Sequence, residues 1–359
     1  MNILAFESSC DETAVALVRD GREVLTDQVF SQADLHAIYG GVVPEIASRS
    51  HVEVISQLAD RALAVTGLTR GDIDAVAVTY APGLIGALLV GVNFAKSAAL
   101  ALGVPLIPVH HVRGHIAANY IAYPELKPPF VCLAISGGNT LICDVRDYTD
   151  LRILGATRDD AAGECFDKTA RVLGLPYPGG KPIDDLSKTG DDRKYKLPIG
   201  HVDGCPYDMS FSGLKTAAAA YLDGIPPAER WPRPVTTAQG APRILRDCCA
   251  SYTRAIVETL LRKVARALER QPDLSTLILA GGVAANSHLR SGAEALMRRR
   301  GGRLLMPSPA LCTDNAVMVA HAGWLLAREG AHHDLALQAV PRGRPIPADM
   351  LYARESPAP

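Results

Sequence analysis

Apolar positions along the first third of the chain fall into short runs and helical repeats. Five runs have the length of a strand, and one set of apolar positions recurs at helical spacing and predicts a helix from residue 45 to 65. A Gly-rich turn at 81–86 leads into a second apolar helix, Leu88–Leu102. The predicted strands are Asn2–Phe6, Thr13–Val18, 23–29, Ile73–Thr79 and Leu106–Val109. Strand, Gly-rich turn, helix and strand form a right-handed crossover unit.

The pattern of the first hairpin returns after residue 129. Phe130–Ile135 is a continuous apolar run, a Ser-bearing turn follows at 136–140, and Leu141–Val145 and Leu151–Ala156 predict two further strands. Strand, Ser-bearing turn and strand also describe residues 2–18. This repetition predicts an α/β protein of two related domains that face each other across a nucleotide-sized cleft. That is the plan of the actin, heat-shock-chaperone and sugar-kinase (ASKHA) superfold.

The remaining pattern sets the predicted domain limits. Helices are expected to start near Asp159, Asp184 and Ser210, a long amphipathic helix spans about 244–270, and a buried strand, Thr276–Ala280, precedes a helix at 288–299. A last strand at 303–306 leads to a terminal helix that begins at Thr313 or Asp314. We predict an N-terminal domain, 1–109, completed by the helix 313–328, then a second domain, 110–312, with an exposed insertion at 225–242 that contains five prolines, and a tail, 329–359.

Composition and charge narrow the class of protein. The 359 residues exceed what one core usually supports, and 37 basic against 38 acidic residues give no overall field that would attract nucleic acid. A local basic patch at Arg298–Arg300 and Arg303 is either such a contact or a solvated helix end. Eight scattered cysteines without CxxC spacing indicate reduced thiols. With no signal peptide and no run of ~20 apolar residues, we expect a cytoplasmic protein without a membrane segment.

The candidate metal chemistry lies at residues 110–115, directly after an apolar strand. If this segment is helical, His111 and His115 stand one turn apart, with about 5–6 Å between their Cβ atoms, and can share a metal ion. His110 points off that face. Two histidines need a further ligand from elsewhere. Asp314, at the predicted start of the last helix, is either that ligand or an ordinary N-cap, and spacing alone favours the cap.

Other segments have the composition of nucleotide contacts. The turns 7–13 and 136–140 carry Ser and acidic or Gly residues that can offer backbone N–H groups to a phosphate, although each is also a common hairpin turn. Gly281–Gly282 follows a buried strand, and Asn286 leads into a helix whose N-terminus can face a ligand. The same residues could serve packing alone.

Taken in order, these segments resemble the TsaD family of tRNA N6-adenosine threonylcarbamoyltransferases, once named O-sialoglycoprotein endopeptidases, from Asn2 to about residue 328. The motifs that carry the resemblance are Glu7–Thr13, Gly41–Glu45, Ala81–Leu84, His111–His115, Ser136–Thr140, Gly163–Lys168, Tyr177–Gly180, Ser210–Lys215, Gly281–Asn286 and Cys312–Asn315. Asn139 and Ala81 depart from the family pattern, which often has His and Gly there.

The resemblance implies a reaction, a cofactor and partners. Threonylcarbamoyl-adenylate (threonylcarbamoyl-AMP), made by a separate enzyme, gives its threonylcarbamoyl group to N6 of the adenosine 3′ of the anticodon in tRNAs that read codons beginning with A, and AMP leaves. One divalent ion, Fe2+ or Zn2+, is implied on His111, His115 and Asp314, which favours the ligand role for Asp314. Family members work with a TsaB-like paralogue and a TsaE-like ATPase.

The resemblance also implies substrate contacts, and the chemistry suggests a base. Asp11 and Glu12 are our candidates for removing or orienting the N6 proton. The implied nucleotide contacts are Ile135, Ser136, Gly137, Gly138, Asn139, Asp167, Gly180, Asp184 and Asn286.

Three other functions compete with this one. His-x-x-x-His is typical of metallopeptidases, but Val112 stands where such enzymes carry a Glu. A small-molecule kinase of the same fold would use magnesium held by carboxylates instead of a histidine pair. A nucleotide-switched scaffold such as actin would leave the metal ligands without a role.

Overall fold

The computed structural model describes the chain except residues 227–229, 233, 236–239, 345–350 and 353–359. The chain divides into two compact units. Unit 1 consists of Met1–Pro128, Arg146–Leu151 and Met306–Leu351, and unit 2 consists of Pro129–Val145 and Arg152–Leu305 with the segment that starts at Tyr352. The predicted boundary after residue 109 differs from this division, because residues 110–128 cluster with unit 1.

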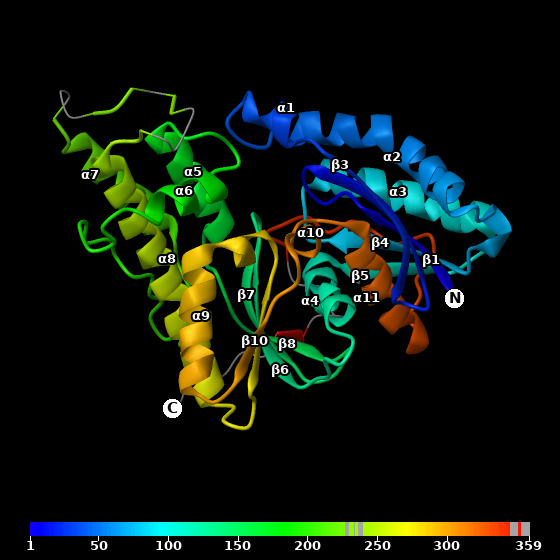
Figure 1. The fold of residues 1–359 in the computed structure, drawn as a ribbon. Coiled ribbons are helices and arrows are strands. Elements are labelled where there is room, and N and C mark those ends of the chain that lie inside the picture. Colours follow the sequence, from blue (N-terminus) through cyan, green and yellow to red (C-terminus); the bar gives the residue numbers. More distant parts are fainter. Residues whose placement is uncertain (227–229, 233, 236–239, 345–350, 353–359) are drawn as a thin grey trace. The chain divides into compact units, whose positions relative to one another are not determined.

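Unit 1 contains a five-stranded sheet in the order β3-β2-β1-β4-β5. β1 pairs antiparallel with β2 and parallel with β4, and β4 pairs parallel with β5. Helices α2 and α3 lie on one side of this sheet and α4 and α11 on the other (Figure 1). The strands are β1 (Asn2–Glu7), β2 (Glu12–Arg19), β3 (Glu23–Ser31), β4 (Ala75–Ala81) and β5 (Leu106–His110). The helices are α1 (Ala33–Ala37), α2 (Pro44–Thr66), the 3-10 helix η1 (Arg70–Asp72), α3 (Ile85–Leu102), α4 (His111–Ala122), α10 (Pro309–Cys312) and α11 (Ala316–Arg328).

The side chains of each central strand in unit 1 point alternately to the two helical layers. Leu4, Phe6 and Val78 belong to the core that α2 and α3 cover. Gly323 of α11 approaches Ala77, the residue before Val78 in β4, so closely that an added Cβ would lie 2.7 Å from the Ala77 Cβ. Both faces are therefore buried, which explains why the strands read as continuous apolar runs.

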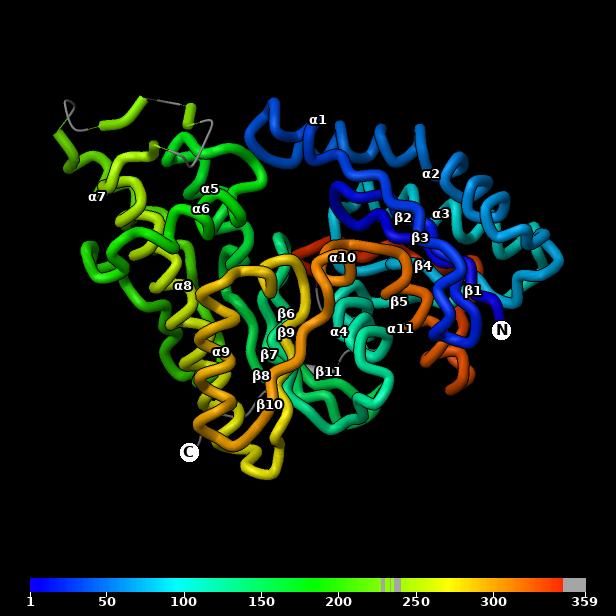
Figure 2. Tube along the Cα trace, in the orientation of Figure 1, coloured from blue at the N-terminus to red at the C-terminus, as the bar shows by residue number. Residues whose placement is uncertain are grey.

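Unit 2 contains a six-stranded sheet in the order β10-β9-β6-β7-β8-β11. β6 pairs antiparallel with β7 and parallel with β9, and β9 pairs parallel with β10. The strands are β6 (Phe130–Ile135), β7 (Thr140–Val145), β8 (Leu151–Ala156), β9 (Thr276–Ala280), β10 (Arg303–Leu305) and β11 (Leu351–Tyr352). The helices are α5 (Ala162–Leu173), α6 (Gly180–Ser187), α7 (Ser212–Asp223), α8 (Arg243–Glu269), the 3-10 helix η3 (Gly282–Ala285) and α9 (Ser287–Arg299). Figure 2 traces the path of the chain through these elements.

The two sheets share one plan. Reading from the third strand of each half, β3-β2-β1-β4-β5 and β8-β7-β6-β9-β10 have the same order, with an antiparallel hairpin beside parallel strands. The repeated pattern of strand, Ser-bearing turn and strand therefore reflects a repeated topology. The two-domain α/β fold expected from the sequence is confirmed.

Two segments treated as peripheral in the sequence are partly packed. In the predicted insertion at 225–242, the indole N–H of the buried Trp231 donates to the Leu173 carbonyl at 2.9 Å. The described part of this insertion is thus not wholly exposed as expected, although residues 227–229, 233 and 236–239 lie outside the described chain. The tail also returns to unit 1, where Val340 N donates to the Tyr80 carbonyl at 2.8 Å and Leu337 is buried. Residues 345–350 and 353–359 of the tail lie outside the described chain.

Helix α3 is long and apolar enough to cross a membrane by composition alone. One face of α3 packs in unit 1, against α2 and β4. Its small residues Ala87, Gly91 and Ala95 are buried there.

Candidate metal centre and substrate residues

Helix α4 presents the histidine pair as the spacing predicts. The helix begins at His111, directly after β5, and its first ten residues are buried. The His110 side chain accepts a hydrogen bond from the Val112 amide at 3.3 Å, so His110 is the N-cap and not part of the pair. The Nε2 atoms of His111 and His115 lie 3.1 Å apart.

Asp314 joins the two histidines. Its Oδ1 lies 3.4 Å from His111 Nε2 and 3.2 Å from His115 Nε2. The N-cap of α11 is the next residue, Asn315, whose side chain accepts from the Met318 amide at 2.8 Å. Asp314 is therefore free of the capping role that spacing alone favoured, and the last helix starts at Ala316 instead of residue 313 or 314.

Close packing of α11 on α4 brings Asp314 to this place. A Cβ added at Gly114 would lie 3.2 Å from Met318 Cγ, so any larger residue there would require the Met318 side chain to shift if the helices were to stay this close. Gly114 lies between the two histidines, and Met318 lies one turn after Asp314. This contact between the two helices brings Asp314 to the histidines, which lie about two hundred residues earlier in the sequence.

The three donor atoms suit a single metal ion. Zinc and similar ions bind imidazole nitrogen and carboxylate oxygen at about 2.0–2.2 Å, which places neighbouring donors about 3.0–3.5 Å apart. The measured separations of 3.1, 3.2 and 3.4 Å fall in this range. Both imidazoles are buried and the Asp314 side chain is 16% exposed. His111, His115 and Asp314 could thus hold a metal ion.

Glu7 contacts His111 at Nδ1, the ring nitrogen on the other side from the donor set, and was not among the predicted site residues. Its Oε2 lies 3.1 Å from His111 Nδ1, and the Ser9 hydroxyl lies 3.2 Å from the same nitrogen. The carboxylate also accepts from the Ser9 amide and the Thr79 hydroxyl, both at 2.6 Å. A carboxylate that orients a ligating imidazole is the usual outer partner of a histidine–metal bond. The signal in the sequence was a charged residue at the end of an otherwise apolar strand.

Electrostatic attraction between His111 and the carboxylates of Asp314 and Glu7 stabilises the ionised form of each group. Burial alone would lower the pKa of His111, but the carboxylates of Asp314 and Glu7 outweigh it and raise that pKa to about 9. Burial likewise acts to raise the pKa of Asp314, yet the two histidines lower it to about 2. For Glu7, the attraction of His111 outweighs the burial, and its pKa is lowered.

The candidate bases lie in unit 1, with Asp11 in the turn after β1 and Glu12 at the start of β2. Both are partly buried, and the Glu12 carboxylate accepts from the Ser31 hydroxyl at 3.1 Å. Burial first, and then the negative charges of Asp11 and Asp314, raise the pKa of Glu12 to about 9. His51 fixes the turn from α2, with its ring nitrogens 2.7 Å from the Thr13 hydroxyl and 2.9 Å from the Cys10 carbonyl.

The predicted nucleotide contacts all belong to unit 2. The turn after β6 is closed by Ser136 N, which donates to the Asn139 carbonyl at 2.8 Å, and by Asn139 N, which donates to the Ser136 hydroxyl at 3.1 Å. Gly281, with φ +84°, lies against this turn, because a Cβ there would be 2.4 Å from the Ile135 carbonyl oxygen. The predicted segment Ile135–Asn139 and the glycine turn after β9 are therefore neighbours.

The other predicted contacts have partners within unit 2. Asp167 accepts from Gly179 N at 2.7 Å, next to Gly180 at the start of α6. Asp184 accepts from the amide and the hydroxyl of Ser287, each at 2.9 Å. Ser287 follows Asn286, whose side chain accepts from the Leu289 amide at 2.9 Å and caps α9. These residues therefore have structural roles whether or not they touch a ligand.

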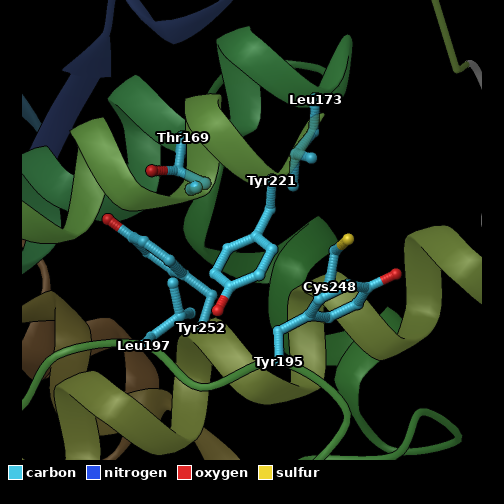
Figure 3. A pocket seen from close by; sticks show the side chains of 8 residues that line it. Thr169, Leu173, Tyr195, Leu197, Tyr221, Cys248 and Tyr252 are labelled. Carbon is cyan, nitrogen blue, oxygen red and sulfur yellow. The ribbon is translucent and has the colours of Figure 1, made fainter. Parts of the chain in front are cut away.

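A separate cavity in unit 2 contains none of these residues. It is lined by Thr169, Leu173, Tyr195, Leu197, Ala218, Tyr221, Cys248 and Tyr252 (Figure 3). Tyr195 and Tyr221 meet edge to face, with ring centroids 5.1 Å apart. The space inside is about 10 Å³, which is the room of roughly one water molecule. This cavity is too small for a nucleotide.

Solved structures share the fold at low sequence identity. T. kodakarensis HypF gives a TM-score of 0.62 at 14% identity over 92% of this chain and 48% of that chain. Component A of the (R)-2-hydroxyglutaryl-CoA dehydratase of Acidaminococcus fermentans gives 0.51 at 13% identity over 91% and 99%. These likenesses establish the ASKHA-type fold alone.

Sequence relatives are much closer. A protein of Desulfovibrio desulfuricans named tRNA N6-adenosine threonylcarbamoyltransferase is 49% identical over 99% of this chain and 98% of its own length. Relatives of the same name in Thermosipho africanus and Clostridium perfringens are 46% and 47% identical over 95% of this chain and 99% and 97% of their own lengths. The model of the TsaD family, tRNA N6-adenosine threonylcarbamoyltransferase, matches residues 23–321. The chain belongs to the TsaD family, transferases that act on tRNA to form N6-threonylcarbamoyladenosine.

Proposed function

We propose that this chain transfers the threonylcarbamoyl group of threonylcarbamoyl-AMP to N6 of the adenosine 3′ of the anticodon, in tRNAs that read codons beginning with A. The observation that carries this proposal is the buried donor set of His111, His115 and Asp314 in a TsaD chain, close to an acidic turn. Family membership supplies the tRNA and the product, and the donor set supplies a means of activating an acyl donor.

One divalent ion, Fe2+ or Zn2+, would be held by His111, His115 and Asp314. When bound, it would act as a Lewis acid that makes the carbonyl of the donor more electrophilic. Such activation is needed because the lone pair of an exocyclic adenine amine is delocalised into the ring. Glu7 would keep the His111 ring oriented, with its Nε2 free for the ion.

Asp11 and Glu12 would provide the acid–base chemistry for the N6 proton that is released in this acyl transfer. N6 attacks the carbonyl carbon, the bond from that carbon to the phosphate oxygen of the adenylate breaks, and AMP leaves with the electron pair. We assign the acceptance of the N6 proton to Asp11. Glu12, whose pKa is about 9, keeps its own proton at neutral pH and is suited to orient Asp11 by a hydrogen bond.

Unit 2 would bind the adenylate. The exposed Gly137 and the partly exposed Gly138 offer backbone N–H groups to a phosphate, since neither carries a side chain that would shield the amide. Ser136 and Asn139 would hold that turn in shape, as their mutual hydrogen bonds suggest. Asn286 would contact the nucleoside with its amide, while Asp167, Gly180 and Asp184 would position the adjoining backbone.

The resemblance to the TsaD family also suggests partners and a location. We propose that the chain works in the cytoplasm with a TsaB-like paralogue and a TsaE-like ATPase. Turnover should therefore be assayed both with the chain alone and with these proteins added.

The test is a product assay. The chain with Fe2+ or Zn2+ is incubated with threonylcarbamoyl-AMP and unmodified tRNA, the tRNA is digested, and the modified nucleoside is measured by mass spectrometry. We expect the modified nucleoside and an equal amount of AMP, and no cleavage of casein or ADP release in parallel samples. Casein cleavage or ADP release without modified tRNA would favour a metal-dependent peptidase or a small-molecule kinase instead.

A further inference from the structure

A groove runs between helices α8 and α9 of unit 2, and none of the predicted nucleotide contacts is among its lining residues. Figures 1 and 2 both show these helices side by side, and the groove has a volume of about 400 Å³. Val257, Leu261 and Leu296 lie among its apolar lining residues. The helices meet closely at Gly292, where an added Cβ would lie 2.5 Å from Leu261 Cδ1. The apolar lining is therefore a helix contact.

Charged side chains flank this apolar lining. α8 contributes Arg254, Glu258 and Arg262, and α9 contributes His288 and Arg299. Glu258 holds two guanidinium groups at once, with Arg254 at 3.3 Å and Arg262 in a shorter ion pair. The Arg254 Nε also donates to the Asp192 carbonyl at 2.7 Å. One carboxylate thus orients two arginines. Asp192 also lines the groove, so three arginines face two acids, and a net charge of +1 remains with His288 neutral.

The charge of this part of the chain differs from the rest. Residues 254–303 contain ten Lys and Arg but four Asp and Glu, a net charge of +6, whereas the whole chain carries −1. The remaining residues therefore carry −7. The excess is made of arginines that are mostly solvent-exposed, including Arg262, Arg266, Arg298, Arg299 and Arg303. A locally basic helical surface on an otherwise acidic chain is an electrostatic match for a polyanion.

We propose that the groove between α8 and α9, with Arg254, Arg262 and Arg299, binds the sugar–phosphate backbone of the tRNA substrate. The planar guanidinium group forms paired hydrogen bonds with phosphate oxygens, and its weak hydration lowers the cost of this contact. Backbone contacts position a nucleic acid without reading its sequence. This inference rests on the proposed function, because the family's tRNA substrate identifies the polyanion.

The first test reverses the charges of the groove. In the full chain, the double variant Arg262→Glu with Arg299→Glu should weaken the Kd for unmodified tRNA by about tenfold or more. The slope of log affinity against log salt concentration should fall in magnitude by about 1.5 to 2, because two phosphate contacts are lost. The matched control is Arg61→Glu with Lys127→Glu, which changes the net charge equally at exposed residues of unit 1.

A second variant separates binding from damage to the fold. Glu258→Gln removes the carboxylate that competes with phosphate for Arg254 and Arg262. We expect it to tighten tRNA binding about threefold, a gain that a merely disrupted helix would not produce. The modification assay should show a lower KM for tRNA in this variant and a higher KM in the double variant, with kcat little changed in both.

The outcomes distinguish this inference from the proposed function. If the unchanged chain with its partners modifies tRNA but the groove variants keep its Kd, salt slope and KM, the groove proposal is wrong and the proposed function stands. An equal loss in the control variant would also overturn it. If the unchanged chain forms no modified nucleoside while the groove variants weaken tRNA binding, the proposed function fails and the binding surface remains.

Discussion

Glu7 Oε2 lies 3.1 Å from His111 Nδ1, and both side chains are buried. A carboxylate at this nitrogen holds its proton in place, so the lone pair of the neutral ring is on Nε2, the atom that faces His115 and Asp314. Glu7 is the last residue of β1 and His111 the first of α4. The contact therefore ties the first strand to the candidate metal centre.

Replacing Glu7 by Gln should weaken metal binding while preserving most of the packing. Gln has the same shape, but its neutral amide is a poorer acceptor for the imidazole N–H, and outer partners of this kind contribute about 10–100-fold to affinity. We expect a loss of that size in the Kd for Zn2+, measured by competition with a chromophoric chelator. The control is Glu45→Gln on the exposed start of α2, which should bind Zn2+ as the unchanged chain does. Equal affinities for all three proteins would contradict the role of Glu7.

Metal binding should stabilise the fold through Asp314. A ligand that binds only the folded chain adds about 2.7 kcal/mol at a concentration of 100 Kd, which raises Tm by a few degrees. Adding Zn2+ to chelator-treated protein should raise its Tm, and Asp314→Asn should lose most of this increase. The modification rate of the variant should also fall by about a hundredfold or more. Asp334→Asn, an exposed acid of the tail, serves as the control. A full Tm response in Asp314→Asn would remove Asp314 from the ligand set.

Two substitutions at Asn286 separate its capping role from the proposed substrate contact. Asn286→Asp keeps an oxygen for the Leu289 amide, so the free energy of unfolding should stay within about 0.5 kcal/mol of the original. Asn286→Ala should cost about 1 kcal/mol, because the cap is lost. Both variants lack the amide donor, and both should bind AMP at least fivefold more weakly by calorimetry. If only Asn286→Ala weakened AMP binding, the loss would come from the missing helix cap and not from a missing contact between the Asn286 amide and AMP.

His321 should make stability depend on pH below neutrality. Burial lowers the pKa of His321 to about 4, and its Nδ1 is paired with the Gly21 carbonyl oxygen. The unfolded chain binds this proton near pH 6.5, whereas the folded chain resists it until about pH 4. The stabilisation is therefore complete above about pH 6.5 and is lost as the pH falls towards 4, with a total of roughly 3 kcal/mol.

Urea unfolding between pH 4 and 7 measures this contribution. The His321→Asn variant should show a shallower decline of the unfolding free energy across that range. The exposed His332 provides the matched control, since His332→Gln should leave the slope unchanged. Identical slopes for His321→Asn and the unchanged chain would refute the assignment.

The sequence predicted the elements and the metal residues because both depend on local spacing. The predicted strand Phe130–Ile135 has the same bounds as β6, and the helical spacing of His111 and His115 depends only on the start of α4. The helix now seen to start at Ala316 was expected two or three residues earlier, since Thr313, Asp314 and Asn315 are all residue types that cap helices. Local pattern could not choose among them.

Contacts between elements far apart in the sequence could not be predicted from the pattern of apolar and polar residues. The contact of Glu7 with His111 requires the strand order β1-β4-β5, and the buried position of Trp231 requires the insertion to reach the end of α5. Neither follows from periodicity. The predicted roles of Ile135–Asn139, Asp167, Gly180, Asp184 and Asn286 in nucleotide binding came from the resemblance, and the experiments on Asn286 and on product formation test them.

The packing of α11 on α4 determines when the metal centre can be assembled during synthesis. The ribosome makes His111 and His115 early, but Asp314 follows after nearly all of unit 2 has been made. A nascent chain released before residue 314 would carry two histidines without their carboxylate. Loading of the cation should therefore require a chain that extends beyond residue 314, and truncation before that residue should abolish it even though both histidines are present.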